Sequence, residues 1–149
     1  MKTSINARTP YKKREVTKVL VVHSTNTSAK EVVDAFDIHR LDCAKGITSI
    51  GYHFVVEYDG TLRYTRPVDE LGFHLKNTDW CSVGILVVGG KDPTGALVDN
   101  FSPSQYKTLQ SIVLLLKAIY SDVEVHKASQ LDEDHKSELN LDKLWKVIR

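Results

Sequence analysis

Runs of continuous apolar residues indicate the strands of this chain. Val19–Val22 and residues 82–88 are aliphatic and rich in β-branched side chains, which is typical of strands buried on both faces. Residues 50–58 form a further candidate strand, and the Asp59–Gly60 pair after it is a strong signal for a two-residue hairpin. The expected strands cover residues 16–23, 50–58, 61–64, 82–88 and 123–126.

Capping residues and helical periodicity indicate three helices between and after these strands. Ser28 and Glu31 form a capping-box signature, so a helix is expected to follow, with Val32, Val33, Ala35 and Phe36 facing the core. Ser102 and Gln105 repeat the signature around a proline at the first helical position. A last helix is expected at 139–148. The expected fold class is therefore α/β: a central mixed β-sheet flanked by helices.

Length and composition fit a basic N-terminal arm, residues 1–15, followed by a single domain, residues 16–149. Hydrophobic residues make up 42% and charged residues 26%, which is ordinary globular usage. The net charge of +1 argues against binding to a nucleic-acid backbone. No apolar run reaches the roughly 20 residues of a membrane span, and the N-terminus lacks the apolar core of a signal peptide. The protein is therefore expected in the cytoplasm, without a membrane anchor.

Two histidines stand at the ends of expected strands. His23 closes the first strand and His126 closes the last. Side chains at strand ends commonly line the functional crevice of α/β folds, and neutral imidazole is a frequent zinc ligand. Single histidines are nevertheless more often structural, and the chain contains no His-Glu-x-x-His, Cys-x-x-Cys or Gly-x-Ser-x-Gly motif. Spacing alone leaves the function open.

The order of several short motifs is more informative. They are Val21-Val22-His23-Ser24-Thr25, Gly51-Tyr52-His53-Phe54, Asp59-Gly60-Thr61, Gly72-Phe73-His74, Ser82-Val83-Gly84-Ile85, Val88-Gly89-Gly90-Lys91-Asp92 and Asn100-Phe101-Ser102-Pro103-Ser104-Gln105. In this order and spacing, residues 16–126 resemble the zinc-dependent N-acetylmuramoyl-L-alanine amidases. That family includes the small phage lysozyme-type amidases and the peptidoglycan recognition proteins. Its fold, a mixed sheet flanked by helices, agrees with the expected fold class.

The resemblance implies a Zn²⁺ site. His23 corresponds to the first zinc ligand, His126 to the second, Tyr52 to the catalytic tyrosine and His74 to a histidine near the substrate groove. A zinc ion with three protein ligands keeps one position for water and lowers its pKa to about 7. The resulting hydroxide would attack the amide carbonyl between the lactyl group of muramic acid and L-alanine. The phenol would stabilise the developing oxyanion.

The C-terminal stretch departs from the family pattern. The third ligand, a Cys or Asp eight residues after the second histidine, falls on Asp134. The family's lysine two residues before that ligand is replaced by Asp132, and His135 stands in place of a proline. Asp134 is therefore the candidate third ligand. Asp132, His135 and Ser137 are the alternatives if the loop is remodelled.

Three functions follow from the resemblance. The first is zinc-dependent hydrolysis of the amide bond between N-acetylmuramic acid and L-alanine in peptidoglycan, as by a phage endolysin that reaches the wall after the membrane is permeabilised. The second, suggested by the altered third-ligand region, is binding of peptidoglycan fragments without cleavage. The third is an added role, in which the basic arm Lys12-Lys13-Arg14 binds a protein such as a polymerase. The chain is expected to be a monomer.

Overall fold

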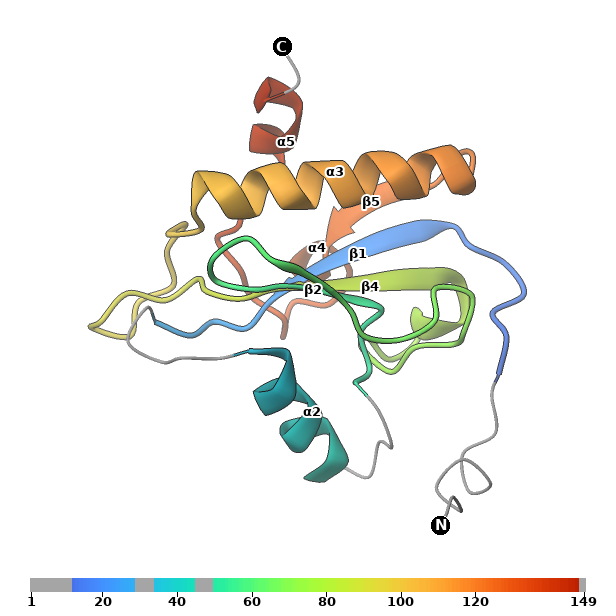
Figure 1. Ribbon diagram of the computed structural model, residues 1–149, viewed down its shortest axis with the longest axis horizontal. Coiled ribbons are helices and arrows are strands. Elements are labelled where there is room, and N and C mark those ends of the chain that lie inside the picture. Colours follow the sequence, from blue (N-terminus) through green and yellow to red (C-terminus); the bar gives the residue numbers. More distant parts are fainter. Residues whose placement is uncertain (1–11, 29–33, 45–49, 148–149) are drawn as a thin grey trace.

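The computed structural model describes residues 12–28, 34–44 and 50–147 (Figure 1). The Ser28–Glu31 capping box and the apolar pair Val32 and Val33 extend outside the described residues. In chain order, the elements are β1 (Val19–Ser24), α2 (Ala35–Ala44), β2 (Phe54–Val56), β3 (Leu62–Tyr64), the 3-10 turn η1 (Asp79–Cys81), β4 (Ser82–Val87), α3 (Pro103–Ile119), β5 (Glu124–Lys127), α4 (Ala128–Leu131) and α5 (Asp142–Val147). None of the described helices is long and apolar enough to cross a membrane.

The five strands form one mixed sheet in the order β3-β2-β4-β1-β5. The β2–β3 hairpin is antiparallel, while β4 pairs parallel with β2 and with β1, and β1 pairs parallel with β5. The expected α/β fold with a mixed, helix-flanked sheet is thus confirmed. Because the four parallel strands run the same way, the residues at their carboxyl ends gather at one edge of the sheet.

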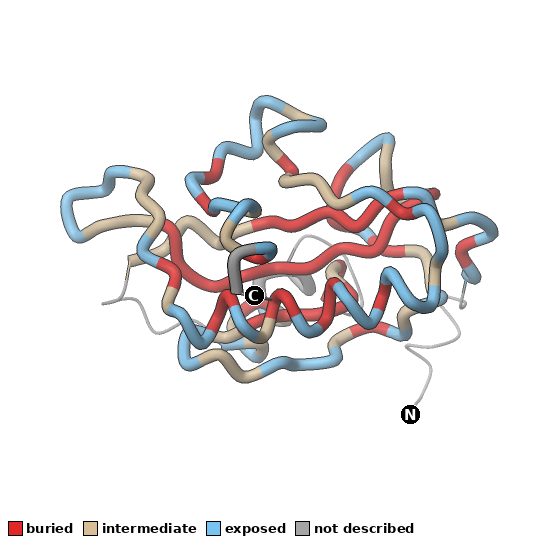
Figure 2. The backbone as a smooth tube through the Cα atoms, turned by 90° about the horizontal axis from the view of Figure 1, so that it is seen from above, coloured by how far each residue is buried: buried red, intermediate tan, exposed pale blue. Residues whose placement is uncertain are grey.

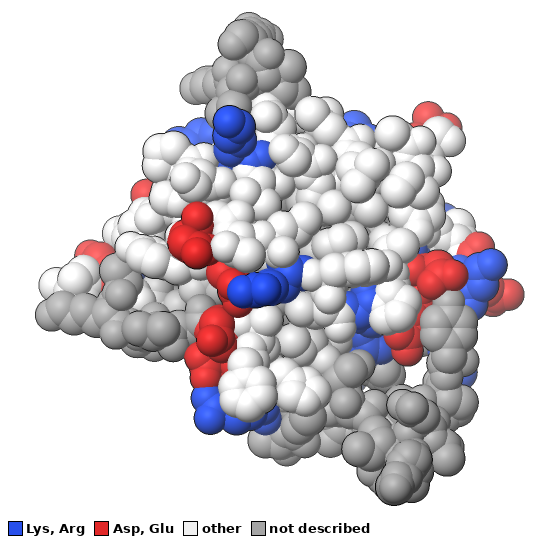
Figure 3. Space-filling model, viewed as in Figure 1, with Lys and Arg blue, Asp and Glu red and all other residues white. Residues whose placement is uncertain are grey.

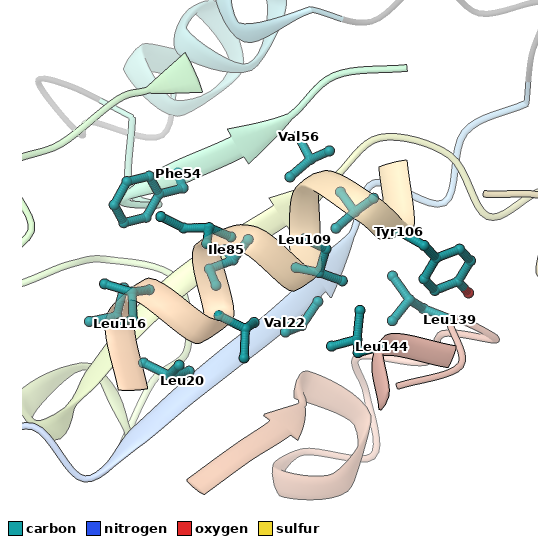
Figure 4. Packing of buried hydrophobic residues seen from close by; sticks show 14 of the residues in the cluster. Leu20, Val22, Phe54, Val56, Ile85, Tyr106, Leu109, Leu116, Leu139 and Leu144 are labelled. Carbon is teal, nitrogen blue, oxygen red and sulfur yellow. The ribbon is translucent and has the colours of Figure 1, made fainter. Parts of the chain in front are cut away.

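Helix α3 covers one face of the sheet. Ser102 accepts a hydrogen bond from the Gln105 backbone, and the Gln105 side chain accepts one from the Ser102 backbone, so the expected capping box forms. Figure 4 shows Leu109 and Leu116 of α3 packed over Leu20 and Ile85 of the sheet. In Figure 2 the central strands are coloured almost wholly as buried, whereas α3 alternates between buried and exposed positions. This layer is the main hydrophobic core.

Helix α2 covers the opposite face (Figure 1). Its Ile38 packs in a smaller core with Val55 of β2 and Leu86 of β4. Side chains alternate along a strand, so the residues directly before and after these two face α3 instead. The expectation that Phe36 faces the core is wrong, since this side chain is 65% exposed. Ile38 takes the core position instead, and the ring of Phe36 lies beside the guanidinium of Arg40, 5.1 Å away.

Buried arginines tie the loop after β3 to the sheet. Arg66 donates from Nε to the Ile50 carbonyl at 2.8 Å and from Nη1 to the Leu71 carbonyl at 3.0 Å. Arg14 donates to the Glu70 carbonyl at 3.1 Å and to the Tyr120 hydroxyl at 3.1 Å. Arg14, which the sequence placed in the basic arm, is therefore part of the folded domain. These bonds join the loop after β3 to the segments that precede β1 and β2.

Candidate functional site

Two buried histidines meet at the carboxyl end of β1. His23 Nε2 lies 2.9 Å from His74 Nδ1, so one nitrogen donates a hydrogen bond and the other accepts it. His74 Nε2 lies 3.0 Å from the hydroxyl oxygen of Ser82, at the start of β4. Ser82, His74 and His23 thus form a hydrogen-bonded chain that runs from the start of β4 toward the end of β1.

The backbone around His74 explains how a histidine fits inside the sheet layer. The amides of His74 and Leu75 both donate to Asp79 Oδ1, at 2.9 and 2.8 Å, which fixes the local turn. The His74 ring then lies against Gly84 of β4. A Cβ at Gly84 would stand 2.5 Å from two carbon atoms of the ring, so only glycine leaves enough room. Burial raises the pKa of the Asp79 carboxyl.

Two further aromatic side chains surround His23. The Tyr52 ring meets the His23 ring edge-on at a centroid distance of 5.0 Å, and the His135 ring does so at 5.6 Å. Tyr52 is also 6.0 Å from the His74 ring. Tyr52 is half-buried, while the His135 side chain is 41% exposed, so the group is accessible from outside. His23, Tyr52, His74 and His135 are called the histidine–tyrosine cluster below.

The electrostatics keep the inner part of the cluster uncharged. Burial lowers the pKa of His23 to about 3, and the charge of His135 adds to this effect. Burial, followed by the charges of His23 and His53, holds the pKa of His74 well below its ordinary value. At neutral pH both rings are neutral imidazoles, each with one donor and one acceptor nitrogen. They can pass on a hydrogen bond but do not present a fixed positive charge.

Residues 132–137 bring His135 to the cluster through two anchors. Ser24 donates from its hydroxyl to the hydroxyl oxygen of Ser137 at 2.7 Å. Asn26 donates from its side-chain amide to the Lys136 carbonyl at 2.8 Å. Both anchoring side chains come from the segment directly after His23. The sequence carried one sign that position 135 differs from the family, since a histidine stands there in place of a proline. His135 was also one of the alternatives to Asp134 as the third ligand.

His126 is not brought to the cluster. It pairs with Val21 in the parallel β1–β5 register, which places it two residues before the level of His23, or roughly 7 Å along the strands. Its Nε2 donates to Glu124 Oε1 at 2.8 Å. Together with Glu124 it lines a separate pocket of about 520 Å³, which Lys18, Cys81 and Leu131 also line.

Asp134 is not brought to His23 either. It is exposed, and its backbone amide donates to Asp132 Oδ1 at 3.0 Å in a local turn. Among residues 12–28, 34–44 and 50–147, no group of three His, Cys, Asp or Glu could hold a metal ion. The structure thus assembles His23, Tyr52 and His74 as the sequence indicates, but not the ligand set His23, His126 and Asp134.

This chain is similar to known proteins in both sequence and fold. A family model described as N-acetylmuramoyl-L-alanine amidase matches residues 12–137. An endolysin of Klebsiella phage KP32 is 35% identical over 115 residues, which are 77% of this chain and 76% of that protein. An endolysin of Escherichia phage T7 is 34% identical over 114 residues, 76% of each chain. Among solved structures, an endolysin amidase from Clostridium intestinale has the same fold, with a TM-score of 0.75 at 19% identity over 94% of this chain and 88% of that one.

Proposed function

Because this chain belongs to the N-acetylmuramoyl-L-alanine amidase family, we propose that it acts on peptidoglycan and cleaves the amide bond between N-acetylmuramic acid and L-alanine. The resemblance carried by the short motifs is confirmed by the family match. One observation supports placing the reaction at the histidine–tyrosine cluster. His23, Tyr52 and His74 come from three separate segments, yet their rings lie within 5.0 to 6.0 Å of one another on the face of the sheet away from α3, beside Gly84.

The side chains of the cluster suit the binding of an amide. As the amide carbonyl is attacked, its oxygen gains negative charge, and the Tyr52 phenol is a suitable hydrogen-bond donor to it. The hydrolysis adds a water hydroxyl to the carbonyl carbon and a proton to the departing L-alanine nitrogen. The neutral His74 ring is bonded at both nitrogens, to His23 and to Ser82, and so orients the His23 ring rather than contacting the substrate itself. His135 stands where the cluster meets solvent.

A zinc ion, the cofactor that the resemblance implies, does not fit the residues as they are arranged. His23 supplies one imidazole, but His126 donates to Glu124 and Asp134 is exposed in its own turn. The site of a catalytic zinc ion normally has three protein ligands. We therefore assign no step of the reaction to zinc.

The same arrangement favours a second candidate function, which is binding of peptidoglycan fragments without cleavage. A site that keeps the tyrosine and the histidines while lacking a complete ligand set can still form hydrogen bonds to a muramyl peptide. On the face shown in Figure 3, basic and acidic side chains are interspersed and separated by uncharged areas.

The test is an assay of purified peptidoglycan for released stem peptides that begin with L-alanine, read by mass spectrometry. We expect the wild type to release them and both His23→Ala and Tyr52→Phe to release far less. Tyr58→Phe is the matched control, because Tyr58 is exposed beside the hairpin turn, outside the cluster. Unchanged release by both cluster variants would refute the proposed site. Retention of the protein on insoluble peptidoglycan without any release would select the second candidate.

A further inference from the structure

By the resemblance, the second zinc ligand is His126 of β5. The residue that comes level with His23 at the end of β5 is a different one. Val22 pairs with Lys127, so the residue that comes level with His23 is Ala128. Ala128 begins α4, is 2% exposed, and packs with Val21 and Leu75. Where a zinc site would need a donor atom from this strand, the chain therefore supplies a methyl group.

His126 does not take that place, because its ring is directed elsewhere. His126 starts roughly 7 Å back along the strand from the level of His23. Its Nε2 is also directed to Glu124, which pairs with Val19 and so lies farther still from His23. Its surroundings are the separate pocket rather than the cluster.

His135 faces His23 from the C-terminal loop instead. The loop is held by the Ser24–Ser137 and Asn26–Lys136 bonds, both of which come from residues next to His23 in the chain. The His135 Nε2 is 3.8 Å from Asp132 Oδ2, a distance beyond a normal hydrogen bond. With its side chain 41% exposed, the ring is at once fixed beside His23 and open to a ligand.

We propose that this chain binds the muramyl peptide without a zinc ion at His23 and His126, and that His135 is the residue through which the C-terminal loop contacts it. The identity of the ligand rests on the proposed function, whereas the statement about zinc does not. The contact expected is one hydrogen bond between the His135 imidazole and a carbonyl or carboxylate oxygen near the lactyl–alanine junction. The inference concerns binding and holds whether or not the bond is then cleaved.

The first measurement is zinc content, by elemental analysis of the wild type and His126→Ala, before and after zinc is added and excess removed by dialysis. We expect no stoichiometric zinc in either protein. The second is calorimetric titration with N-acetylmuramoyl-L-alanyl-D-isoglutamine, in chelator and in added zinc. We expect the same affinity in both buffers. His135→Ala should bind about three- to tenfold more weakly, the effect of one net hydrogen bond. His126→Ala should bind like the wild type.

His135→Gln, together with thermal unfolding of each variant, separates loss of a contact from loss of the fold. The glutamine keeps a polar side chain of moderate size, so weaker binding by a variant with unchanged melting temperature supports the contact. One zinc per chain that is lost in His126→Ala would overturn the inference, as would an equal loss of affinity in His126→Ala and His135→Ala. Absence of binding by the wild type in both buffers would overturn the His135 contact and the choice of ligand. The zinc content tests whether His23 and His126 bind zinc, independently of the binding result.

Discussion

Replacement of Gly84 by alanine should displace the His74 ring and so test how the cluster is built. A Cβ at Gly84 would stand 2.5 Å from His74 Cδ2 and Cγ and 2.8 Å from Nδ1, whereas carbon atoms in good contact are about 3.5–4.0 Å apart. The ring must therefore move by about 1 Å. It cannot do so freely, because both of its nitrogens are engaged, by His23 at 2.9 Å and by Ser82 at 3.0 Å.

The expected cost follows from these contacts. Overpacking of a core costs about 1–3 kcal/mol, and a buried polar group left without a partner costs about 1–3 kcal/mol more. We expect Gly84→Ala to lower the free energy of unfolding by about 3 kcal/mol. The measurement is urea denaturation, with the midpoint and slope both recorded so that a change in stability is distinguished from a change in the unfolded state.

A double-mutant cycle with His74→Ala tests the cause. If the clash with the ring is the reason, Gly84→Ala should cost far less once the ring is gone, giving a coupling of about 2 kcal/mol or more. Gly95 provides the control, because an added Cβ there meets nothing within 4 Å although its φ is +94°. Gly95→Ala should cost about 1 kcal/mol from backbone strain and should be additive with His74→Ala. Additive costs for Gly84→Ala and His74→Ala would refute the reasoning.

Two further predictions concern stability. Gln105→Ala should lower the free energy of unfolding, measured by urea denaturation, by about 2–4 kcal/mol. Gln105 caps α3 and also donates from Nε2 to the carbonyls of Val88 at 2.6 Å and Glu57 at 3.2 Å. A loss below about 1 kcal/mol would contradict this role. Burial lowers the pKa of His23 to about 3 and of His53 to about 4, below the ordinary 6.5. The unfolded chain therefore binds more protons between these values, and the free energy of unfolding should fall as the pH drops from 6.5 towards 4. Each histidine should contribute a slope of about 1.4 kcal/mol per pH unit, and a His23→Gln variant with the same slope as the wild type would contradict its share.

Local patterns were enough to predict much of the fold. The aliphatic run of β1 and the capping box of α3 each depend on neighbours a few residues away, and both form as expected. Phe36 shows the limit of prediction from local sequence patterns. An apolar residue on a helix was expected inside, but α2 meets the sheet through Ile38, and the direction of that contact depends on how the helix is docked.

By itself, the sequence determined the approximate positions of the strands and the capped start of α3. It also determined that a histidine lies near the end of β1, with a tyrosine and a second histidine available from later motifs. Tertiary structure alone decided which side chains surround His23. The β1–β5 register brings Ala128 rather than His126 level with it, and two hydrogen bonds from Ser24 and Asn26 bring in His135. Strand register and loop path are set by contacts between residues more than 100 positions apart. Spacing along the chain does not encode such contacts, and a shift of two residues in a strand moves a side chain by roughly 7 Å.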